Sequence, residues 1–276
     1  MLLSRRTKYL QVALNGTLDD AFAVINSLPL SDRILIEAGT PLIKKYGMGS
    51  ITRLKSWWEA RLSGSNLSNL FVNTSESAEA TVPSGNLGPI ISLLMKQFSI
   101  PQSSPDKVER SVAKASTLEA YIVADLKTMD RAISETTEVK MAGASAAVVL
   151  GLAPLETLNA FIDSCAKLGM DSMVDMMNVG EPYKILRKLK KLPTVVILHR
   201  GVDEELYNKS KPLPYHNIIK VKGSYNLLIS VAGGDTSREV QRAVFNGADI
   251  VVVWKDFFTI ASDTGRLAAE FLKEIK

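Results

Sequence analysis

Charged side chains end several short apolar runs of this sequence, and one group of them has the types and spacing of an acid–base site. Asp125 and Lys127 are two residues apart at the end of one run, and Asp130 follows shortly after. On an extended segment, side chains two apart point to the same side. Two carboxylates beside an ammonium group keep it charged and oriented, so Lys127 could stabilise a developing oxyanion or deliver a proton.

Glu37 ends another apolar run and suggests a second use for Asp125. If the two runs form neighbouring strands, both carboxylates lie at the same end of the sheet. Ligation by carboxylate oxygens, with the remaining positions left to water and substrate, suits Mg²⁺. Glu37 and Asp125 are therefore candidate metal ligands. Ordinary salt bridges at strand ends are the alternative, which the accumulation of charge at several run ends disfavours.

One of the two histidines also ends an apolar run. His199 precedes Arg200 and Gly201, whereas His216 lies near the expected start of a helix. An imidazole titrates near neutral pH, so His199 is the candidate general acid or base, with a structural histidine as the competing interpretation. Asn15 and Asp175 end two further runs.

Eight short runs rich in Val, Ile and Leu predict the strands that position these residues. They are residues 10–14, 34–36, 121–124, 147–150, 173–174, 195–198, 227–231 and 250–253. Nearly every run is followed by a segment whose apolar residues recur at spacings of three and four, as in an amphipathic helix. Eight such units favour a closed (β/α)₈ TIM barrel of the α/β class over an open doubly wound sheet. Active sites of such barrels form at the carboxyl ends of the strands, where these polar residues fall.

One segment, from about residue 62 to 116, interrupts the alternation between the second helix and the third strand. It contains 12 serines and four prolines, and only residues 87–98 have the pattern of a short helix. We therefore predict one barrel domain over residues 1–276 that carries an insertion. The simpler interpretation is that this insertion is a surface loop without a specific role, and the alternative is that it forms a contact or assembly surface.

Composition narrows the class of protein. The 276 residues are 46% hydrophobic and 22% charged, a mixture that excludes disordered and collagen-like chains. The single cysteine, Cys165, excludes an internal disulfide and a multi-thiolate metal site, and its amphipathic surroundings predict a buried side chain. No apolar run has the length of a membrane span or a signal peptide, so we expect a soluble, cytoplasmic protein without a membrane partner.

The positive charge of the chain does not indicate a nucleic-acid partner. The net charge of +4 arises from 33 basic and 29 acidic residues, a balance that suits an anionic metabolite better. The densest basic group consists of Lys184, Arg187, Lys188, Lys190 and Lys191. Read as a helix, this group lies on a solvated face and lacks the interleaved aromatic residues that stack on bases.

Taken in order, the motifs resemble the orotidine 5′-monophosphate decarboxylase superfamily. They lie at residues 10–14, 36–43, 124–130, 174–179, 199–203 and 231–234. Within it, the chain is most similar to the 3-hexulose-6-phosphate synthases, with the 3-keto-L-gulonate-6-phosphate decarboxylases next. Glu37 discriminates between branches, because orotidylate decarboxylases carry a lysine on that strand. Val202 favours the synthase branch, because the gulonate branch has an arginine at this place.

The resemblance implies a homodimer with shared active sites, in which Asp130 reaches into the pocket of the partner subunit. It also implies Mg²⁺ held by Glu37 and Asp125, an enediolate intermediate of a sugar phosphate, and proton transfer by His199. The implied reaction of the synthase branch is aldol addition of formaldehyde to ribulose 5-phosphate, or its reverse. Substrate binding is implied for Asn15, Asp175, Gly233, Gly234 and Lys255.

Three places depart from the pattern of the family. Asn15 replaces an aspartate, so it keeps a hydrogen-bonding oxygen but cannot act as a base. Asp235 stands where relatives have an apolar residue, and its charge would repel a nearby phosphate. Trp254 and Lys255 replace a Gly-Arg pair that binds phosphate in relatives, and lysine lacks the bidentate fork of arginine. The chemical core is retained while the phosphate-binding residues differ.

Three functions compete at this level. The first is a Mg²⁺-dependent aldol lyase of the hexulose-phosphate synthase type. The second is a decarboxylase of the same superfamily acting on a sugar phosphate or orotidine 5′-monophosphate. The third is a catalytically impaired barrel with a binding role, for which the insertion at residues 62–116 would be the contact surface.

Overall fold

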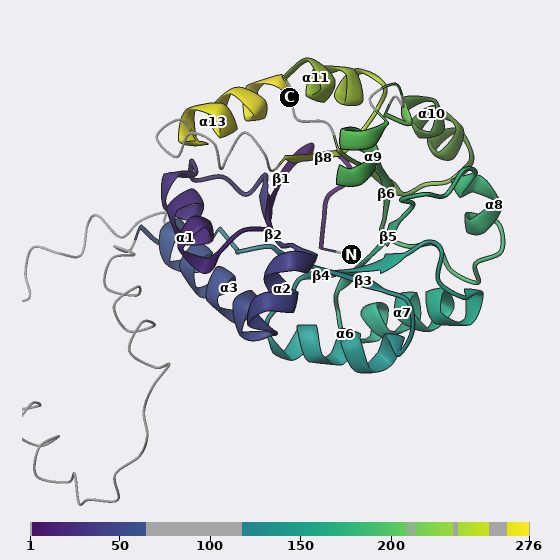
Figure 1. Cartoon of the computed structure of the whole chain (residues 1–276), viewed down its shortest axis with the longest axis horizontal. Coiled ribbons are helices and arrows are strands. Elements are labelled where there is room, and N and C mark those ends of the chain that lie inside the picture. The colour runs from purple at the N-terminus through teal and green to yellow at the C-terminus, as the bar shows by residue number, and fades with distance from the viewer. Residues whose placement is uncertain are drawn as a thin grey trace, which may run out of the picture. The chain divides into compact units, whose positions relative to one another are not determined.

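Eight parallel strands close into a barrel with helices around the outside (Figure 1). This computed structural model describes residues 2–64, 118–208, 210, 213–233, 237–253 and 264–275. The strands follow one another around the barrel in sequence order, and the last strand pairs with the first. The predicted (β/α)₈ barrel is therefore confirmed.

The strands and helices lie where the apolar runs and the helical spacing predicted them. The strands are β1 (Tyr9–Leu14), β2 (Ile34–Ala38), β3 (Ile122–Thr128), β4 (Ala146–Leu150), β5 (Asp171–Asp175), β6 (Val195–His199), β7 (Leu228–Ala232) and β8 (Ile250–Val253). The helices are α1 (Leu18–Ser27), α2 (Thr40–Tyr46), α3 (Gly49–Leu62), α6 (Ala132–Met141), α7 (Leu155–Lys167), α8 (Pro182–Leu186), α9 (Val202–Tyr207), α10 (Tyr215–Ser224), α11 (Ser237–Phe245) and α13 (Thr264–Glu274). Strand β3 continues four residues beyond its apolar run, through the Asp-x-Lys motif.

The interior of the barrel is a packed apolar core. Nearly every strand residue is buried, because one face of each strand packs inward and the other lies under the helices. The inward residues alternate along the strands, as Val123 of β3, Met173 of β5 and Val195 of β6 illustrate. This packing makes a firm base for side chains at the strand ends.

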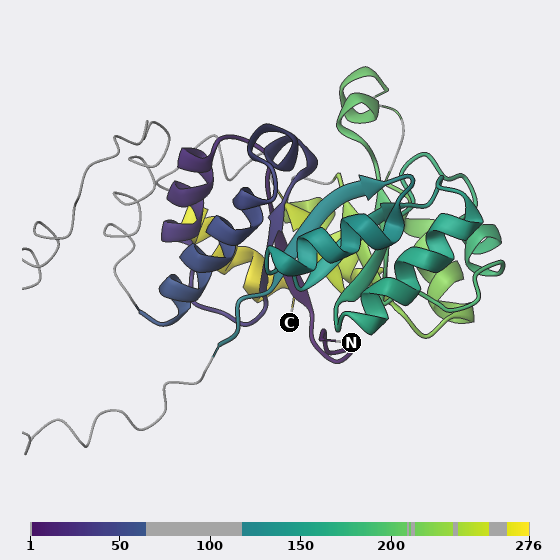
Figure 2. The ribbon, with the colours of Figure 1, turned by 90° about the horizontal axis from the view of Figure 1, so that it is seen from below.

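Different segments of the chain cover the two ends of the barrel. Figure 2 shows α2 and the protruding α9 at one end and the N-terminus at the other. At the N-terminal end, Leu3 is buried in the core cluster, and the Asp171 carboxylate accepts hydrogen bonds from the backbone N–H groups of Leu2 and Leu3 and from the Tyr121 hydroxyl. The first residues of the chain are thereby fixed beneath the barrel.

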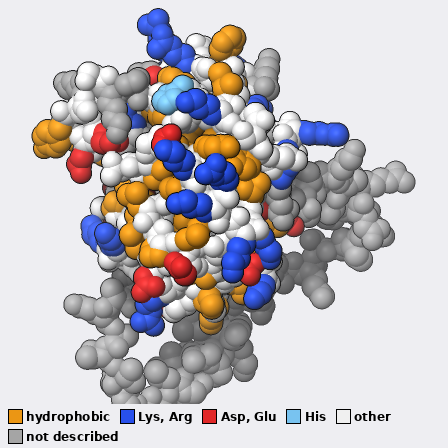
Figure 3. Space-filling view, turned by 90° about the vertical axis from the view of Figure 1, so that its right-hand side faces the viewer, with side chains coloured by type: hydrophobic (Ala, Val, Ile, Leu, Met, Phe, Trp, Pro, Cys, Tyr) orange, Lys and Arg blue, Asp and Glu red, His pale blue; other side chains and the backbone are white. Residues whose placement is uncertain are grey.

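Several other expectations can be compared with the structure. Cys165 is fully buried, as predicted, and burial raises the pKa of its thiol to about 12. The basic group at residues 184–191 is exposed, as predicted, on the face shown in Figure 3. Reading it as one helix was wrong, because α8 ends at Leu186 and turns follow.

The insertion at about residues 62–116 lies outside the described residues from position 65 onward, as does the predicted short helix at 87–98. Among the residues that the structure describes, no helix is long and apolar enough to span a membrane.

The anchoring role of Asp171 can be tested with Asp171→Asn. We expect a loss of about 1–3 kcal/mol in the free energy of unfolding, because an amide nitrogen replaces one acceptor oxygen facing buried donors. Urea denaturation measures the loss. Asp163→Asn is the matched control, since Asp163 pairs with Lys191 on the surface and should change stability little. Equal losses in the two variants would contradict this role.

Candidate active site

A cavity of about 600 Å³ opens at the carboxyl ends of the strands. Seven of the residues singled out in the sequence line it: Asn15, Glu37, Asp125, Lys127, Asp175, His199 and Gly233. Its floor is the barrel core, represented by Val148 of β4 and Ile197 of β6. The core therefore positions these polar side chains directly.

Not every predicted residue is in this cavity. Asp130 is exposed and does not line it. Gly234 and Lys255, together with Asp235 and Trp254, lie outside the described residues. The proposed roles of these residues therefore stay predictions.

Lys127 is held between two carboxylates. Its Nζ lies 2.9 Å from Asp125 Oδ2 and 3.1 Å from Asp175 Oδ2. Burial alone would lower the pKa of Lys127, but the two negative charges outweigh it and raise the pKa above its usual value. Lys127 is therefore a fixed cation. Within the chain, the second carboxylate beside it is Asp175 rather than Asp130.

The backbone around Lys127 departs from a regular strand. The pairing of β3 with β4 shifts register between Ala124 and Thr128, and Lys127 has a φ of 47°. This left-handed conformation is unfavourable for a residue with a side chain, and such strain gathers at functional sites. Asp125 and Lys127 do reach the same cavity, as predicted, but a local irregularity of the strand accompanies their approach.

Asp175 also holds His199. Its Oδ2 atom accepts a hydrogen bond from His199 Nδ1 at 2.8 Å, while Oδ1 accepts one from the backbone N–H of Met177 at 2.9 Å. Burial opposes ionisation of both side chains, yet their mutual attraction raises the pKa of His199 and, with Lys127, lowers the pKa of Asp175. With Nδ1 bound to Asp175, Nε2 is the ring nitrogen available for proton transfer.

Glu37, unlike Asp175, has a raised pKa because its surroundings disfavour the charged form. Burial and the neighbouring charge of Asp125 raise the pKa of Glu37 to about 7, against a hydrogen bond donated by Gln11 Nε2 that stabilises the charged form. Two carboxylates thus lie close together in a poorly solvated place. A cation between them would remove this repulsion.

The oxygen atoms of Asp125 fit such a cation. Its Oδ2 accepts hydrogen bonds from Lys127 and from Thr40 Oγ1, but its Oδ1 is buried without a hydrogen-bond partner. Among the described residues, no group of three or more Asp, Glu, His or Cys side chains is arranged to hold a metal ion. The unpartnered Oδ1 of Asp125 and its repulsion with Glu37 instead suit a site in which these two residues supply carboxylate ligands, with water and substrate completing the shell.

Sequence reasoning missed two polar supports of the site. Gln11 lies in the apolar strand β1 and binds Glu37, while Thr40 begins α2 and binds Asp125. A buried polar residue inside an apolar run was the available signal for Gln11. No local signal distinguishes Thr40, because its partner is 85 residues away.

Two glycines permit close approaches at the cavity. A Cβ atom on Gly39 would lie 1.9 Å from Asn15 Oδ1, so glycine leaves space for the Asn15 side chain. Gly233 has a φ of +91°, and a Cβ there would lie 2.2 Å from the backbone oxygen of Arg200. The first glycine lets the end of β2 approach the end of β1, and the second lets the end of β7 approach the end of β6.

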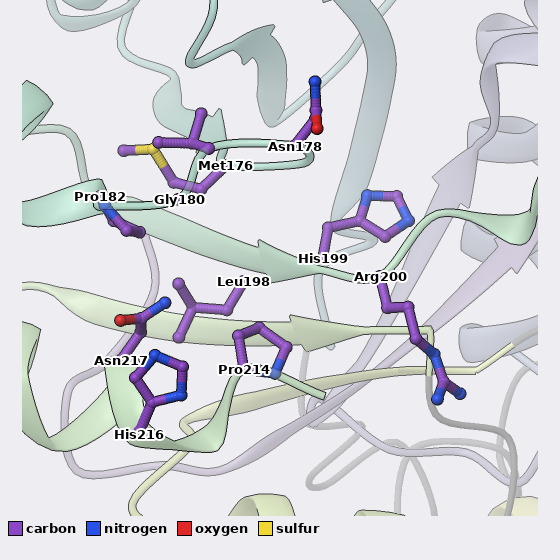
Figure 4. A pocket seen from close by; sticks show the side chains of 11 residues that line it. Met176, Asn178, Gly180, Pro182, Leu198, His199, Arg200, Pro214, His216 and Asn217 are labelled. Atoms are coloured by element: carbon purple, nitrogen blue, oxygen red, sulfur yellow. The ribbon is translucent and has the colours of Figure 1, made fainter. Parts of the chain in front are cut away.

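Arg200 lies beside this second approach. A neighbouring cavity of about 320 Å³ extends toward α8 and α10 (Figure 4). His199 and Arg200 line both cavities, and in Figure 4 their side chains point in different directions. Sequence reasoning gave Arg200 no role.

The model of the orotidine 5′-phosphate decarboxylase / HUMPS family matches residues 94–253. The chain belongs to this family. The resemblance stated from the motifs is therefore confirmed. The match includes β3 to β8 and thus Asp125, Lys127, Asp175 and His199.

Curated relatives carry the description bifunctional enzyme Fae/Hps. The protein from Methanocella arvoryzae is 32% identical over 97% of this chain and 53% of its own length. The protein from Methanosphaera stadtmanae is 32% identical over 96% of this chain and 52% of its own length. The chain thus spans about half the length of the curated relatives it matches.

Solved structures share the fold at lower identity. The 3-hexulose-6-phosphate synthase of Salmonella typhimurium has a TM-score of 0.68 and 20% identity, covering 97% of this chain and 100% of that one. KGPDC from Streptococcus mutans in complex with D-R5P has a TM-score of 0.62 and 15% identity, covering 97% and 98%. Both support the barrel fold described above.

The bond between Asp175 and His199 predicts a pH-dependent contribution to stability. Because Asp175 raises the pKa of His199, the stabilisation is fully present below the ordinary pKa of 6.5 and is lost as the pH rises through the raised value. The free energy of unfolding should therefore exceed that of His199→Gln by more at about pH 5.5 than at about pH 9.

Urea denaturation of both proteins at the two pH values measures this difference. His216→Gln is the control, because His216 is exposed and does not contact Asp175. A difference that is the same at both pH values would be incompatible with the ion pair.

Proposed function

We propose that this chain is a divalent-cation-dependent aldol lyase of the 3-hexulose-6-phosphate synthase type. The proposed reaction joins formaldehyde to ribulose 5-phosphate through an enediolate, or runs in reverse. The single observation that carries the proposal is the cluster of Glu37, Asp125, Lys127, Asp175 and His199 around one cavity. The similarity to Fae/Hps proteins over nearly the whole chain adds support.

Proton transfer falls to His199. Its unprotonated Nε2 can accept a proton from the substrate carbon next to the carbonyl, and Asp175 stabilises the imidazolium that forms. After the carbon–carbon bond to formaldehyde has formed, the imidazolium can return this proton to the new alkoxide oxygen. His199 therefore accepts one proton and returns one proton in each addition, so no second acid or base is needed.

Charge stabilisation falls to Lys127 and to the two candidate metal ligands. Lys127 is a fixed cation in a shielded cavity, so it can stabilise the negative charge of the enediolate oxygens without moving. Glu37 and Asp125 would hold Mg²⁺, which when bound supplies further positive charge beside these oxygens. Gln11 and Thr40 orient the two carboxylates.

A homodimer with shared sites is part of the proposal. Asp130 is exposed just after β3, and three apolar residues are exposed in the same part of the chain: Met129 after β3, Ile133 on α6 and Leu152 after β4. Several exposed apolar side chains are typical of an interface. A second copy packed here could receive Asp130 in its cavity.

Lys127→Ala tests the catalytic proposal. The substitution should lower kcat by about 10²- to 10³-fold, as expected for loss of a charge that stabilises an oxyanion. Formation of hexulose 6-phosphate from ribulose 5-phosphate and formaldehyde is the measurement, with thermal unfolding as the check of the fold. Lys140→Ala, an exposed lysine on α6, is the matched control. Unchanged turnover by Lys127→Ala would refute the assigned role.

Removal of divalent cations tests the role of Glu37 and Asp125. Dialysis against a chelator should abolish product formation, and added Mg²⁺ should restore it, because the two carboxylates would otherwise repel the developing oxyanion. Full activity in protein shown by elemental analysis to be free of metal would rule out this part of the proposal.

Mixing Lys127→Ala with Asp130→Ala tests the shared site. Each variant alone should be inactive, while hybrid dimers contain one site with Lys127 from one subunit and Asp130 from the other. Random reassociation should restore about a quarter of the activity of the wild type. No recovery, despite hybrid dimers shown by differently tagged subunits, would place Asp130 outside the partner's site.

A further inference from the structure

Two polar side chains are buried inside the barrel with one atom each left unpaired. Gln11 on β1 is 1% exposed and Ser230 on β7 is fully buried. Among the described residues, Gln11 Oε1 and Ser230 Oγ have no hydrogen-bond partner. An unpaired polar group in a protein interior costs free energy, so two of them in one core point to a partner that both share.

Both side chains face the interior of the barrel. Side chains two positions apart on a strand point to the same face. Ala13, two residues after Gln11, and Ala232, two residues after Ser230, belong to the core cluster inside the barrel. Gln11 and Ser230 therefore point inward as well.

The strand register places Gln11 and Ser230 in the same layer of the core. In an eight-stranded barrel the strands tilt, so a layer advances by about one residue per strand, and alternate strands fill it with side chains. Starting from Gln11, this step leads through the pairings of all eight strands and returns to Gln11. The layer consists of Gln11, Val123, Met173 and Ser230.

The surroundings of this layer are almost entirely apolar. The inward residues of the next layer toward the cavity are Glu37, Val148, Ile197 and Val252, and those of the layer beneath are Leu35, Ala146, Val195 and Ile250. Apart from Glu37, none of these side chains can form a hydrogen bond. Gln11 and Ser230 are therefore the nearest polar side chains to one another within their layer.

The distance between the two strands leaves room for a small bridging molecule. Only β8 separates β7 from β1, so the two strands lie roughly 10 Å apart. Gln11 Nε2 donates to Glu37 on β2, and Oε1 on the same amide group is therefore directed away from β2. Bulky branched residues usually fill such layers, so the short Ser230 side chain leaves space beside Gln11.

We propose that a buried water molecule links Ser230 Oγ to Gln11 Oε1, and that Ser230 is thereby a positioning residue for Glu37. The Ser230 hydroxyl donates to the water, and the water donates to Gln11 Oε1, so both unpaired atoms gain a partner. Gln11 then keeps Nε2 directed at Glu37, whose carboxylate keeps the orientation of a metal ligand. The role of this relay rests on the proposed function, in which Glu37 binds a divalent cation.

A high-resolution crystal structure of the protein tests the water directly. We expect one ordered water within about 3 Å of both Ser230 Oγ and Gln11 Oε1. In Ser230→Ala this water should be lost, because one of its two partners is gone. A direct contact between the two side chains, or an interior without ordered water at this place, would overturn the proposal.

Binding of Mn²⁺, measured by calorimetry on the full chain, tests the positioning role without turnover. Gln11→Leu should raise the Kd of Mn²⁺ by about 10- to 100-fold, as for other partners of metal ligands, and Ser230→Ala by about 3- to 10-fold, because it acts through one more contact. The double variant should have the Kd of Gln11→Leu alone, since Ser230 acts only through Gln11. Effects that multiply in the double variant would contradict the relay.

Ser172→Ala is the matched control. Ser172 is a buried serine on β5 whose hydroxyl accepts a hydrogen bond from the backbone N–H of Thr194, outside the layer of Gln11. This variant should leave the Kd of Mn²⁺ unchanged. If Ser172→Ala and Ser230→Ala raised the Kd equally, the effect would be a general loss of packing and the proposal would fail. This comparison also decides the matter if Gln11→Leu does not fold.

The outcomes separate the relay from the proposed lyase. Weakened Mn²⁺ binding in Ser230→Ala, with the water in place and no turnover by the wild type, supports the relay and refutes the lyase. Turnover by the wild type with an unchanged Kd of Mn²⁺ in Ser230→Ala supports the lyase and overturns the relay. A wild type that binds no Mn²⁺ overturns the positioning role.

Discussion

The Asp175 carboxylate is the contact on which the rest of the site depends. One of its oxygen atoms accepts hydrogen bonds from both Lys127 and His199, and the other is fixed by the backbone of Met177. Three strands, β3, β5 and β6, are tied together through this single group. Because Asp175 is buried, solvent does not weaken these bonds, and both side chains keep their positions.

The balance of charge in the cavity explains why a divalent cation suits it. In the hydrogen-bonded cluster and beside it, the three carboxylates of Glu37, Asp125 and Asp175 face two side chains that can be positive, Lys127 and His199. Asp125 and Asp175 share Lys127, and His199 pairs with Asp175, whereas burial and the charge of Asp125 raise the pKa of Glu37 to about 7. The excess negative charge therefore collects at β2 and β3, where Asp125 Oδ1 also lacks a partner. These are the conditions under which bound Mg²⁺ would stabilise the folded site.

The sequence predicted the barrel well because apolar runs and strand ends are local features. Seven predicted residues share the cavity, since parallel strands necessarily bring their carboxyl ends to one side. Contacts between distant segments were not predictable in the same way. The partner of Lys127 from β5, the bond of Thr40 to Asp125 and the position of Arg200 depend on strand register and on a backbone irregularity in β3. No pattern along the chain predicts these contacts between residues that are far apart in the sequence.

Most of the residues that depart from the family pattern lie on other strands than the residues of the acid–base cluster. The groups that would handle the enediolate lie on β2, β3, β5 and β6, and strand pairing and shared hydrogen bonds constrain them tightly. Three of the departures from the family pattern, Asp235, Trp254 and Lys255, follow β7 and β8 instead. Arg200 bridges the two regions, because its backbone continues from His199 while its side chain binds Gly233. The changes that follow β7 and β8 therefore accompany an acid–base cluster whose hydrogen bonds among Asp125, Lys127, Asp175 and His199 are in place.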